Sequence, residues 1–327
     1  MELSRKGLPI RLYPTALQKY FEHPTCRVAK ESSRRSLRST VQLFNQDHPD
    51  LELYELTERH LEDWLGKRLQ SGVSDSTVNK NAKHLNSLLE WAWRQGHIKE
   101  NPARDVQRTL KLRPKPVREH RWLNEDQAQT ILDSFQTLTN LDLRDALILR
   151  LGFTAGLRND EIRSLPLSAL ARIGDQRITV VGKNDRIAQV SVPERTAELL
   201  VAWRTEYERG WHELGRGDLS ETAPVIVGLK NLNDWNTGQR SLVPQWGKGI
   251  TQQALGKIVA KRTAAAGYRI APHDMRRSFA GMIYEKLGLE KTSDALRHSS
   301  LETTRLYIKQ RQDAAALAVE EAGLRLR

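Results

Sequence analysis

The sequence predicts a mainly α-helical protein with a small β-sheet, divided into a helical domain and a larger mixed α/β domain. Three observations support this prediction. Apolar residues recur at helical spacing in both halves of the chain, two short alternating segments at 178–181 and 187–192 have strand character, and a basic stretch without apolar periodicity separates the halves. The length of 327 residues suits two domains of about 100–200 residues each.

The smaller helical domain is expected over residues 29–103. Residues 1–28 would precede it as an irregular N-terminal extension, because Pro9, Pro14 and Pro24 interrupt any helix. Three helices are expected, each with one apolar face. Their buried residues are expected to be Leu37, Val41 and Phe44 in the first, Leu61, Trp64, Leu65 and Leu69 in a second over 57–70, and Val78, Leu85, Leu88, Leu89 and Ala92 in a third that begins near Ser74 and stops near Gly96.

Residues 104–121 have the composition of an extended basic linker, with seven basic and two acidic side chains. The whole chain has a formal net charge of +12, and residues 1–121 contain 23 basic and 15 acidic residues, so most of the excess lies in this part. Such a balance favours a polyanionic partner, because basic side chains displace counterions from phosphates. Charge alone does not separate nucleic acid from an anionic membrane surface.

The larger domain is expected over residues 122–312, followed by a C-terminal helix or tail over 313–327. Its expected strands flank a hairpin turn at 182–185. Its helices are expected at 124–135, 141–153, 196–207, 252–266, 273–287 and 300–312.

The chain has one cysteine, Cys26, which excludes an internal disulfide and a cysteine-rich zinc site. No apolar run reaches the ~20 residues that cross a bilayer. We therefore expect a cytoplasmic, nucleoid-associated protein without membrane contact.

Five short segments of the larger domain contain side chains suited to chemistry on a phosphate. Arg158 stands before a helix start, where backbone N–H groups also face anions. His273 and Arg276 are three residues apart, so they share one helix face. The remaining three are Lys183 in the hairpin turn, His298 before a predicted capping box at Ser299 and Glu302, and Tyr307 about two turns into that last helix. Each residue alone has an ordinary explanation, such as a surface arginine, a solvated lysine or a core tyrosine.

In combination, these residues resemble the active site of the tyrosine recombinase (phage integrase) family, which is Arg, Lys, His-x-x-Arg, His or Trp, then Tyr in chain order. The matching positions are Arg158, Lys183, His273, Arg276, His298 and Tyr307. The surrounding Gly-Leu-Arg-x-x-Glu segment and the Ser-Ser-Leu-Glu-Thr-Thr-Arg-Leu-Tyr segment are also similar to the family. The resemblance covers about 122–312, and the helical domain looks like the family's core-binding domain.

The sequence departs from the family pattern in three places. Arg297 stands where the family usually has glycine, and Met275 replaces a common leucine, a change of similar volume. About twenty residues around 231–249 look like an insertion relative to compact members.

The resemblance implies cleavage of DNA through a 3′-phosphotyrosyl intermediate at Tyr307. Arg158 and Arg276, with His298 as a further donor, would neutralise the non-bridging oxygens of the phosphate. His273 would accept the tyrosine proton, and Lys183 would protonate the leaving 5′ oxygen. No nucleotide cofactor or metal is expected, since the sequence has no Walker-type loop and no convincing carboxylate cluster for Mg²⁺.

The expected partner is double-stranded DNA with inverted-repeat core sites, bound by a homotetramer on two duplexes, with possible accessory DNA-bending or directionality factors. Phosphate contacts are expected from the linker and from Arg34, Arg35, Arg38, Lys80 and Lys83. The sequence favours a recombinase of a mobile element. A chromosome-dimer-resolving recombinase, a type IB topoisomerase and a non-catalytic DNA-binding protein remain as alternatives.

Overall fold

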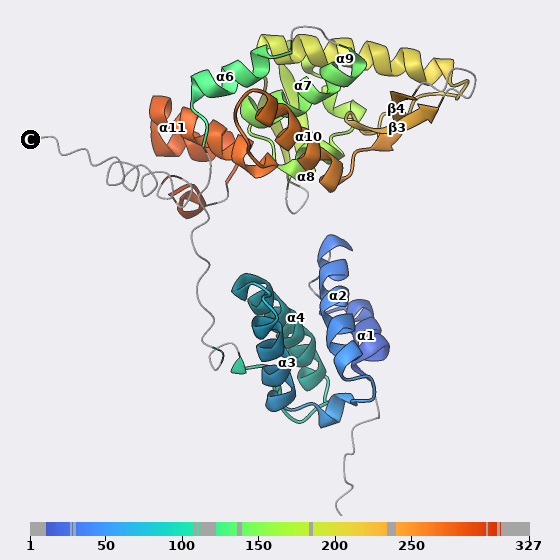
Figure 1. Ribbon diagram of the computed structural model, residues 1–327, viewed down its shortest axis with the longest axis vertical. Helices are drawn as coiled ribbons and strands as arrows, with labels where there is room; N and C mark the ends of the chain where they lie inside the picture. The colour runs from blue at the N-terminus through green and yellow to red at the C-terminus, as the bar shows by residue number, and fades with distance from the viewer. Residues whose placement is uncertain are drawn as a thin grey trace, which may run out of the picture. The chain divides into compact units, whose positions relative to one another are not determined.

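The computed structural model describes two compact units, residues 1–118 and 119–327. Within them the structure describes residues 11–26, 28, 31–106, 110, 122–135, 139–182, 186–233, 240–298, 300–305 and 308, without the side chains of 231–233, 240 and 241. Most of the predicted linker, the C-terminal tail 313–327, Lys183 and Tyr307 lie outside these ranges. Figure 1 shows the elements of each unit.

The smaller unit is a helical bundle, as the sequence predicts. It consists of η1 (Leu12–Ala16), α1 (Leu17–Glu22), α2 (Glu31–Asp47), η2 (Leu53–Glu55), α3 (Glu58–Gln70) and α4 (Asp75–Arg94). The Ser74 side chain accepts a hydrogen bond from the Thr77 backbone and caps α4. Helix α4 contacts α1, α2 and α3. Its predicted apolar residues Val78, Leu85, Leu88, Leu89 and Ala92 are all buried.

The segment expected to be an irregular lead-in is partly helical. Helix α1 lies between Pro14 and Pro24, so these prolines bound a helix rather than interrupt one. Leu12, Ala16 and Leu17 are buried in the same core as α2, α3 and α4. A helix this short is not stable by itself, so it is stabilised by its apolar contacts with the bundle.

Over its described residues the larger unit is mostly helical, with two small antiparallel sheets where the sequence predicts one. Its helices are α6 (Glu125–Asp133), α7 (Asn140–Phe153), α8 (Asn159–Ser164), α9 (Glu194–Glu213), α10 (Gln252–Ala265) and α11 (Pro272–Leu296), with short turns η3 (Leu167–Leu170) and η4 (Ile173–Asp175). Its strands are β1 (Arg177–Val181), β2 (Ile187–Ser191), β3 (Val227–Asn233) and β4 (Arg240–Gly249). Strand β1 pairs with β2, and β3 pairs with β4.

Helix α7 is the central element of the larger unit. Ten of the eleven residues from Leu143 to Phe153 are buried, and the helix contacts α6, α8, α9, α10 and α11. A helix that is apolar all round belongs in a core. Because α7 ends at the turn that leads to Arg158, and His273 lies in the first turn of α11, the packing of these two helices sets the distance between two candidate site segments.

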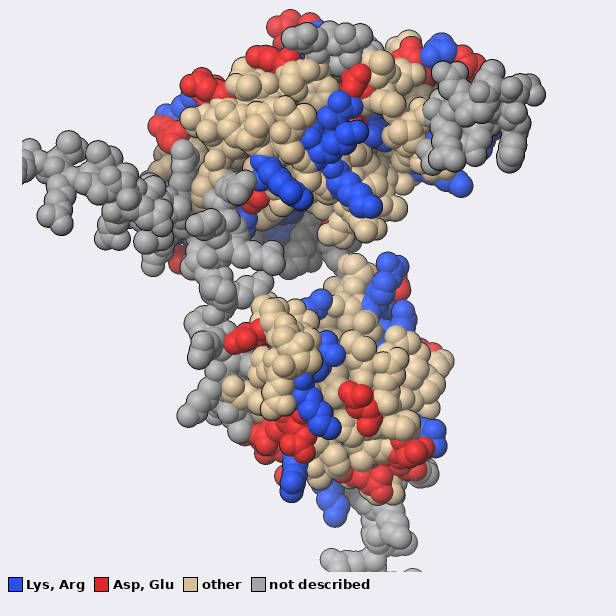
Figure 2. Space-filling view, in the orientation of Figure 1, with Lys and Arg blue, Asp and Glu red and all other residues tan. Residues whose placement is uncertain are grey.

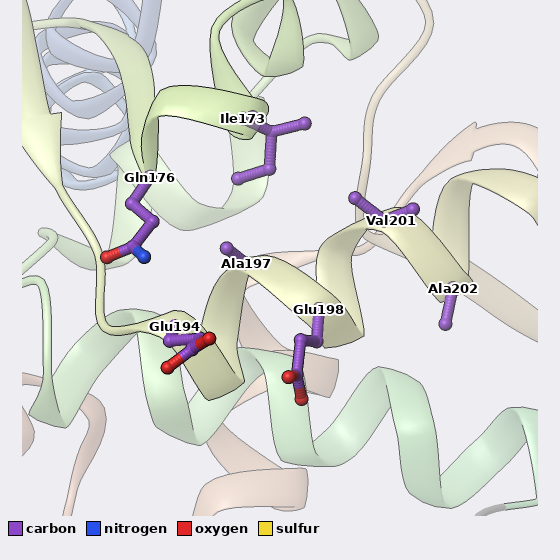
Figure 3. Close-up of a pocket in the computed structure, with 8 residues that line it drawn as sticks. Ile173, Gln176, Glu194, Ala197, Glu198, Val201 and Ala202 are labelled. Carbon is purple, nitrogen blue, oxygen red and sulfur yellow. The ribbon is translucent and has the colours of Figure 1, made fainter.

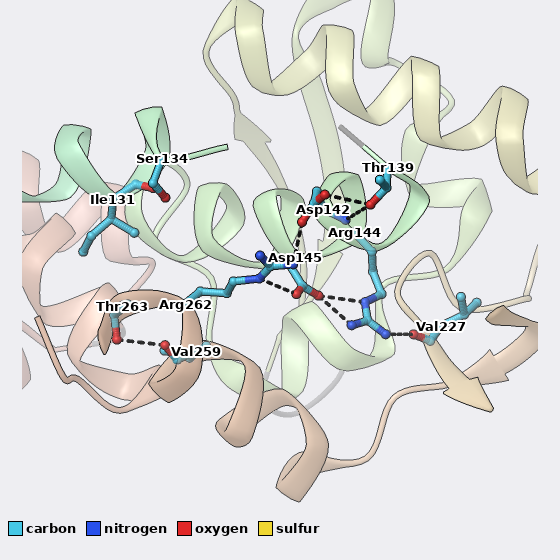
Figure 4. A network of polar contacts seen from close by, with 10 residues as sticks. All are labelled: Ile131, Ser134, Thr139, Asp142, Arg144, Asp145, Val227, Val259, Arg262 and Thr263. Carbon is cyan, nitrogen blue, oxygen red and sulfur yellow. Dashed lines mark hydrogen bonds and ion pairs between the residues drawn. The ribbon is translucent and has the colours of Figure 1, made fainter. Parts of the chain in front are cut away.

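A buried ionic network ties α7 to α10 and to the start of β3 (Figure 4). The Arg144 guanidinium donates to Asp145 Oδ1 at 3.0 Å and 2.6 Å, and Arg262 of α10 donates to Asp145 Oδ2 at 2.7 Å and to Asp142 Oδ1 at 2.7 Å. Arg144 Nη1 also donates to the Val227 carbonyl at 3.5 Å. Since each charge is paired, the network fixes the relative position of these elements rather than leaving a buried ion unsatisfied.

The segment expected to be an insertion, around 231–249, forms most of the β3–β4 ribbon. The ribbon is held on α9 at its base. The Trp246 indole lies so close to Gly210 that a Cβ at that position would overlap it. The Gly247 backbone N–H donates to the Tyr207 hydroxyl at 2.8 Å. In the part of the chain that the structure describes, no helix is both long enough and apolar enough to cross a membrane.

Two helical glycines of the larger unit should respond in opposite ways to alanine. A Cβ at Gly152 in α7 would lie 2.9 Å from Met275 Cβ in α11, whereas a Cβ at Gly256 in α10 would have no atom within 4 Å outside its own helix backbone. Gly152→Ala should therefore destabilise the protein by about 1–3 kcal/mol through overpacking. Gly256→Ala, the matched control, should stabilise it by up to about 1 kcal/mol through helix propensity.

Urea unfolding of the full chain, followed by circular dichroism, measures both effects. Equal and small changes for the two variants would show that the contact between α7 and α11 is not tightly packed.

Candidate active site

Arg158 is the N-cap residue of α8, directly after a sharp turn. Gly156 has φ +59°, and a Cβ there would overlap the Phe279 ring of α11, so this turn needs glycine. The Arg158 backbone N–H donates to Glu161 Oε2 at 2.8 Å, and its Nη1 donates to Glu161 Oε1 at 2.8 Å. The Arg158 side chain keeps 37% of its surface exposed, which leaves it accessible to an anion.

Arg276 joins the site segments through its backbone contacts. It is fully buried on α11, and its Nη1 donates to the Gly156 carbonyl oxygen. Its Nη2 donates to the Leu296 carbonyl oxygen at 2.5 Å. One guanidinium therefore holds the turn before Arg158 and the end of α11 before His298, although these segments are about 140 residues apart in the sequence.

His273 and His298 are both held in their neutral form by this surrounding. Desolvation by the surrounding protein atoms is the largest cause that lowers the pKa of His273 to about 4, and the charges of Arg277 and Arg276 lower it further, although the residue still reaches solvent. Burial, followed by the charges of Arg276 and Arg158, lowers the pKa of His298 to about 4. The His298 Nδ1 shares a hydrogen bond of 2.8 Å with the Thr304 hydroxyl.

The other two candidates, Lys183 and Tyr307, lie outside the described residues. Their described neighbours lie beside the same cluster. A Cβ at Gly182 would be 4.0 Å from Glu161 Oε1, and Thr304, three residues before Tyr307, contacts His298. Arg158, His273, Arg276 and His298 are thus gathered in one place, and the chain segments next to Lys183 and Tyr307 reach it.

Glu161 and Thr304 are site residues that the sequence reasoning did not assign a role. Burial alone would raise the pKa of the Glu161 carboxyl, but the Arg158 backbone N–H, the charge of Arg297 and the Arg158 guanidinium hold that pKa below its ordinary value. The spacing Arg-x-x-Glu at a helix start is a signal for this contact, because a residue three positions into a helix reaches back to the N-cap.

The five candidate DNA-binding residues of the smaller unit differ in their surroundings. Arg34 donates to the Val28 carbonyl at 2.8 Å, and the guanidinium carbons of Arg34 and Arg38 lie 5.3 Å and 5.6 Å from the Phe21 ring centroid. Arg35, Lys80 and Lys83 are exposed. Figure 2 shows lysine and arginine side chains gathered over the middle of one face of the larger unit.

The site does not coincide with the pocket of about 480 Å³ drawn in Figure 3. That pocket lies between η4 and α9, and it is lined by Ile173 of η4 and by Glu194, Ala197, Glu198 and Val201 of α9. None of the candidate catalytic residues lines it. Over the described ranges, no cluster of histidine, cysteine and acidic residues could hold a metal ion.

Curated relatives of the chain are tyrosine recombinases. The chain is 27% identical over 279 residues to tyrosine recombinase XerC of Mycobacterium sp. (strain KMS). The aligned region covers 83% of this chain and 84% of the relative. It is 24% identical over 241 residues to tyrosine recombinase XerD of Listeria monocytogenes serovar 1/2a (strain EGD-e), which covers 73% of each chain.

Solved structures with a similar fold are integrases bound to DNA. A lambda integrase dimer bound to a COC′ core site aligns with a TM-score of 0.61 and 15% identity, over 90% of this chain and 77% of that one. The Tn1549 transposon integrase in complex with transposon right end DNA aligns with a TM-score of 0.62 and 15% identity, over 94% and 99% of the two chains. At these identities the likeness establishes the fold.

Two family models match the sequence and together cover most of it. The phage integrase SAM-like domain matches residues 16–109, and the phage integrase family matches residues 121–313. The second match alone covers more than half of the chain and contains all six candidate catalytic residues. The chain therefore belongs to the phage integrase family and is a tyrosine site-specific recombinase.

Proposed function

We propose that the chain cuts and rejoins duplex DNA through a covalent bond between the Tyr307 oxygen and the 3′ phosphate. The observation that carries this proposal is the pair of hydrogen bonds from Arg276 to Gly156 and Leu296, which brings Arg158 and His298 beside one buried guanidinium. Two arginines next to each other favour a dianion-like transition state, in which a phosphate gains charge as the nucleophile arrives.

The proposed reaction exchanges one phosphoester for another. The Tyr307 oxygen forms a bond to phosphorus, the bond from phosphorus to the 5′ oxygen breaks, and the tyrosine proton passes to His273. A neutral imidazole is able to accept this proton, and the lowered pKa of His273 keeps it neutral at pH 7. Lys183 donates a proton to the leaving 5′ oxygen. Attack by a 5′ hydroxyl of a partner strand reverses these steps.

His298 is proposed as a hydrogen-bond donor to the phosphate. When the Thr304 hydroxyl donates to His298 Nδ1, the single N–H of the neutral ring is on Nε2. Thr304 thereby selects the tautomer that offers a proton to the phosphate oxygen without requiring a charged imidazole.

The proposed substrate is double-stranded DNA with inverted-repeat core sites, bound by four protomers on two duplexes. The exposed Arg35, Lys80 and Lys83 supply phosphate contacts, whereas Arg34 and Arg38 mainly hold α1 through Phe21. Accessory bending or directionality factors complete the proposed assembly. A mobile element is the proposed genetic context, and the reaction takes place in the cytoplasm on the nucleoid.

The covalent intermediate is tested with Tyr307→Phe. The wild-type chain is incubated with nicked duplexes that have a randomised centre, and adducts that survive denaturation are recovered and sequenced. Tyr307→Phe should bind the enriched duplex with unchanged affinity and form no adduct, because only the attacking oxygen is lost. Adducts with Tyr307→Phe, or none with the wild type, would contradict the proposal.

The same capture, repeated with nicked fragments of the source genome, distinguishes the alternatives. Captured fragments of the source genome next to the gene itself indicate a mobile element, whereas a single chromosomal site indicates dimer resolution. Relaxation of a supercoiled plasmid without recombinants indicates a topoisomerase, and site binding without any adduct indicates a non-catalytic DNA-binding protein.

Lys183→Ala tests the general acid. Strand cleavage of the captured duplex should slow by ~10²–10⁴-fold, because the 5′ oxygen leaves without a proton. A 5′-phosphorothiolate duplex should restore the rate of the variant, since a thiolate leaves readily without protonation. Absence of this rescue would remove Lys183 from the proposed role, and Lys230→Ala, an exposed lysine of β3, is the matched control.

Lowering the pH should strengthen DNA binding and slow cleavage. A bound phosphate opposes the arginine charges, so it raises the pKa of His273 and His298 from about 4 toward the ordinary 6.5. The complex then takes up protons as the pH falls from 7.5 to 5.5, which raises affinity by up to about tenfold per pH unit for each histidine. Cleavage slows over the same range because protonated His273 no longer accepts the tyrosine proton.

Fluorescence anisotropy at fixed salt measures the affinity, and single-turnover kinetics measure cleavage. His298→Gln should flatten the pH dependence of binding, while His212→Gln, at an exposed position of α9, should leave it unchanged. Cleavage that rises in parallel with binding would contradict the role of His273.

A further inference from the structure

Arg297 has an unfavourable backbone conformation at the end of α11. Its φ is +56° and ψ is +42°, the left-handed region in which glycine is the usual residue after a helix. Only two described residues other than glycine have a positive φ. Glycine at this position would relieve the strain. The presence of arginine therefore needs an explanation from the contacts of its side chain.

The Arg297 side chain turns inward to the site. Only 16% of it is exposed, and its Nη2 donates to Glu161 Oε2 at 2.8 Å. Glu161 is 5% exposed and binds the Arg158 guanidinium through its other oxygen at 2.8 Å. One buried carboxylate therefore holds two guanidinium groups, one of which is the proposed phosphate ligand.

This carboxylate would otherwise oppose the reaction. A buried Glu161 paired with Arg158 alone forms a neutral pair, in which the carboxylate competes with the scissile phosphate for the same guanidinium. With Arg297 present, the three groups have a net charge of +1. When Arg158 turns to the phosphate, Glu161 keeps a charged partner and is not left buried and unpaired.

We propose that Arg297 is a positioning residue that neutralises Glu161 and so releases Arg158 to bind the scissile phosphate. The inference rests on the proposed function, because it assigns the phosphate to Arg158. It explains why this chain has arginine at a left-handed position that favours glycine. The strain of the backbone is retained because the side chain reaches Glu161 from there.

A double-mutant cycle separates this role from a direct contact between Arg297 and DNA. The full chain is compared with Arg297→Gly, Glu161→Gln and the double variant, using the duplex captured by the wild type. Glycine suits the left-handed backbone, and glutamine keeps an oxygen for the Arg158 backbone N–H, so both variants should fold. Circular dichroism checks the fold, and the two readouts are the dissociation constant and the single-turnover cleavage rate at saturating protein.

The expected result is a loss of rate that depends on Glu161. Arg297→Gly should lower the cleavage rate roughly tenfold, less than the ~10²–10³-fold loss expected for a group that touches the transition state. The dissociation constant should change by less than about threefold. In the Glu161→Gln background, removal of Arg297 should change the rate by less than about twofold, since no buried carboxylate remains to be neutralised.

Two controls make the result specific. Arg297→Lys should recover part of the rate, because an ammonium still neutralises Glu161 although it lacks the guanidinium geometry. Arg209→Ala removes an arginine that pairs with Glu206 and Glu213 on the surface of α9, and it should leave the rate unchanged.

Each opposing outcome has a defined meaning. Equal losses on removal of Arg297 with and without Glu161 indicate a direct phosphate contact and overturn the positioning role. A wild-type chain that cleaves at the same rate as Arg297→Gly overturns this inference alone. A wild-type chain that forms no adduct overturns the proposed function together with it.

Discussion

The buried guanidinium of Arg276 is the interaction on which the site depends. It lies on α11 and donates to carbonyl oxygens of Gly156 and Leu296, so three separate chain segments meet at one planar group. A charge taken out of water needs several hydrogen bonds to remain there. Loss of either carbonyl would therefore displace both the turn that leads to Arg158 and the helix end that leads to His298. The same group serves the fold and, in the proposed reaction, the phosphate.

The packing of the larger unit makes this arrangement possible. Helix α7 ends at the turn containing Gly156, and the Arg144–Asp145–Arg262 network fixes α7 against α10, which precedes α11 in the chain (Figure 4). The close approach of Gly152 to Met275 fixes α7 against α11. Because these contacts lie in the core, the site segments have defined positions before any DNA binds, which is the condition for electrostatic preorganisation.

Local patterns carried most of the fold prediction, and contacts between distant segments account for the rest. The buried faces of α3 and α4 follow from apolar spacing. The helix expected at 273–287 ends directly before Gly288, whose φ of +77° puts a kink in α11 before the helix continues to Leu296. Helix α1 was missed because its stability comes from the bundle core. The β3–β4 ribbon was seen only as an insertion, because Trp246 anchors it to Gly210 on another element. The candidate residues were found by their order and neighbours, yet the link from Glu161 to Arg297 spans 136 positions and leaves no periodic signal.

Among the described residues, the two with a left-handed backbone that are not glycine show how strain and side-chain contacts are related. Gln176 has φ +55° in the tight turn before β1, where its carbonyl accepts a hydrogen bond from Val192 at 2.9 Å and its side chain is exposed. There the backbone turn itself requires the conformation, and many polar residues would serve. At Arg297 the turn again requires a positive φ, but the side chain is largely buried on Glu161. Arg297 faces the proposed reacting groups, and its contact with Glu161 is the best explanation for an arginine where the backbone prefers glycine. Departures from local preference concentrate at functional sites.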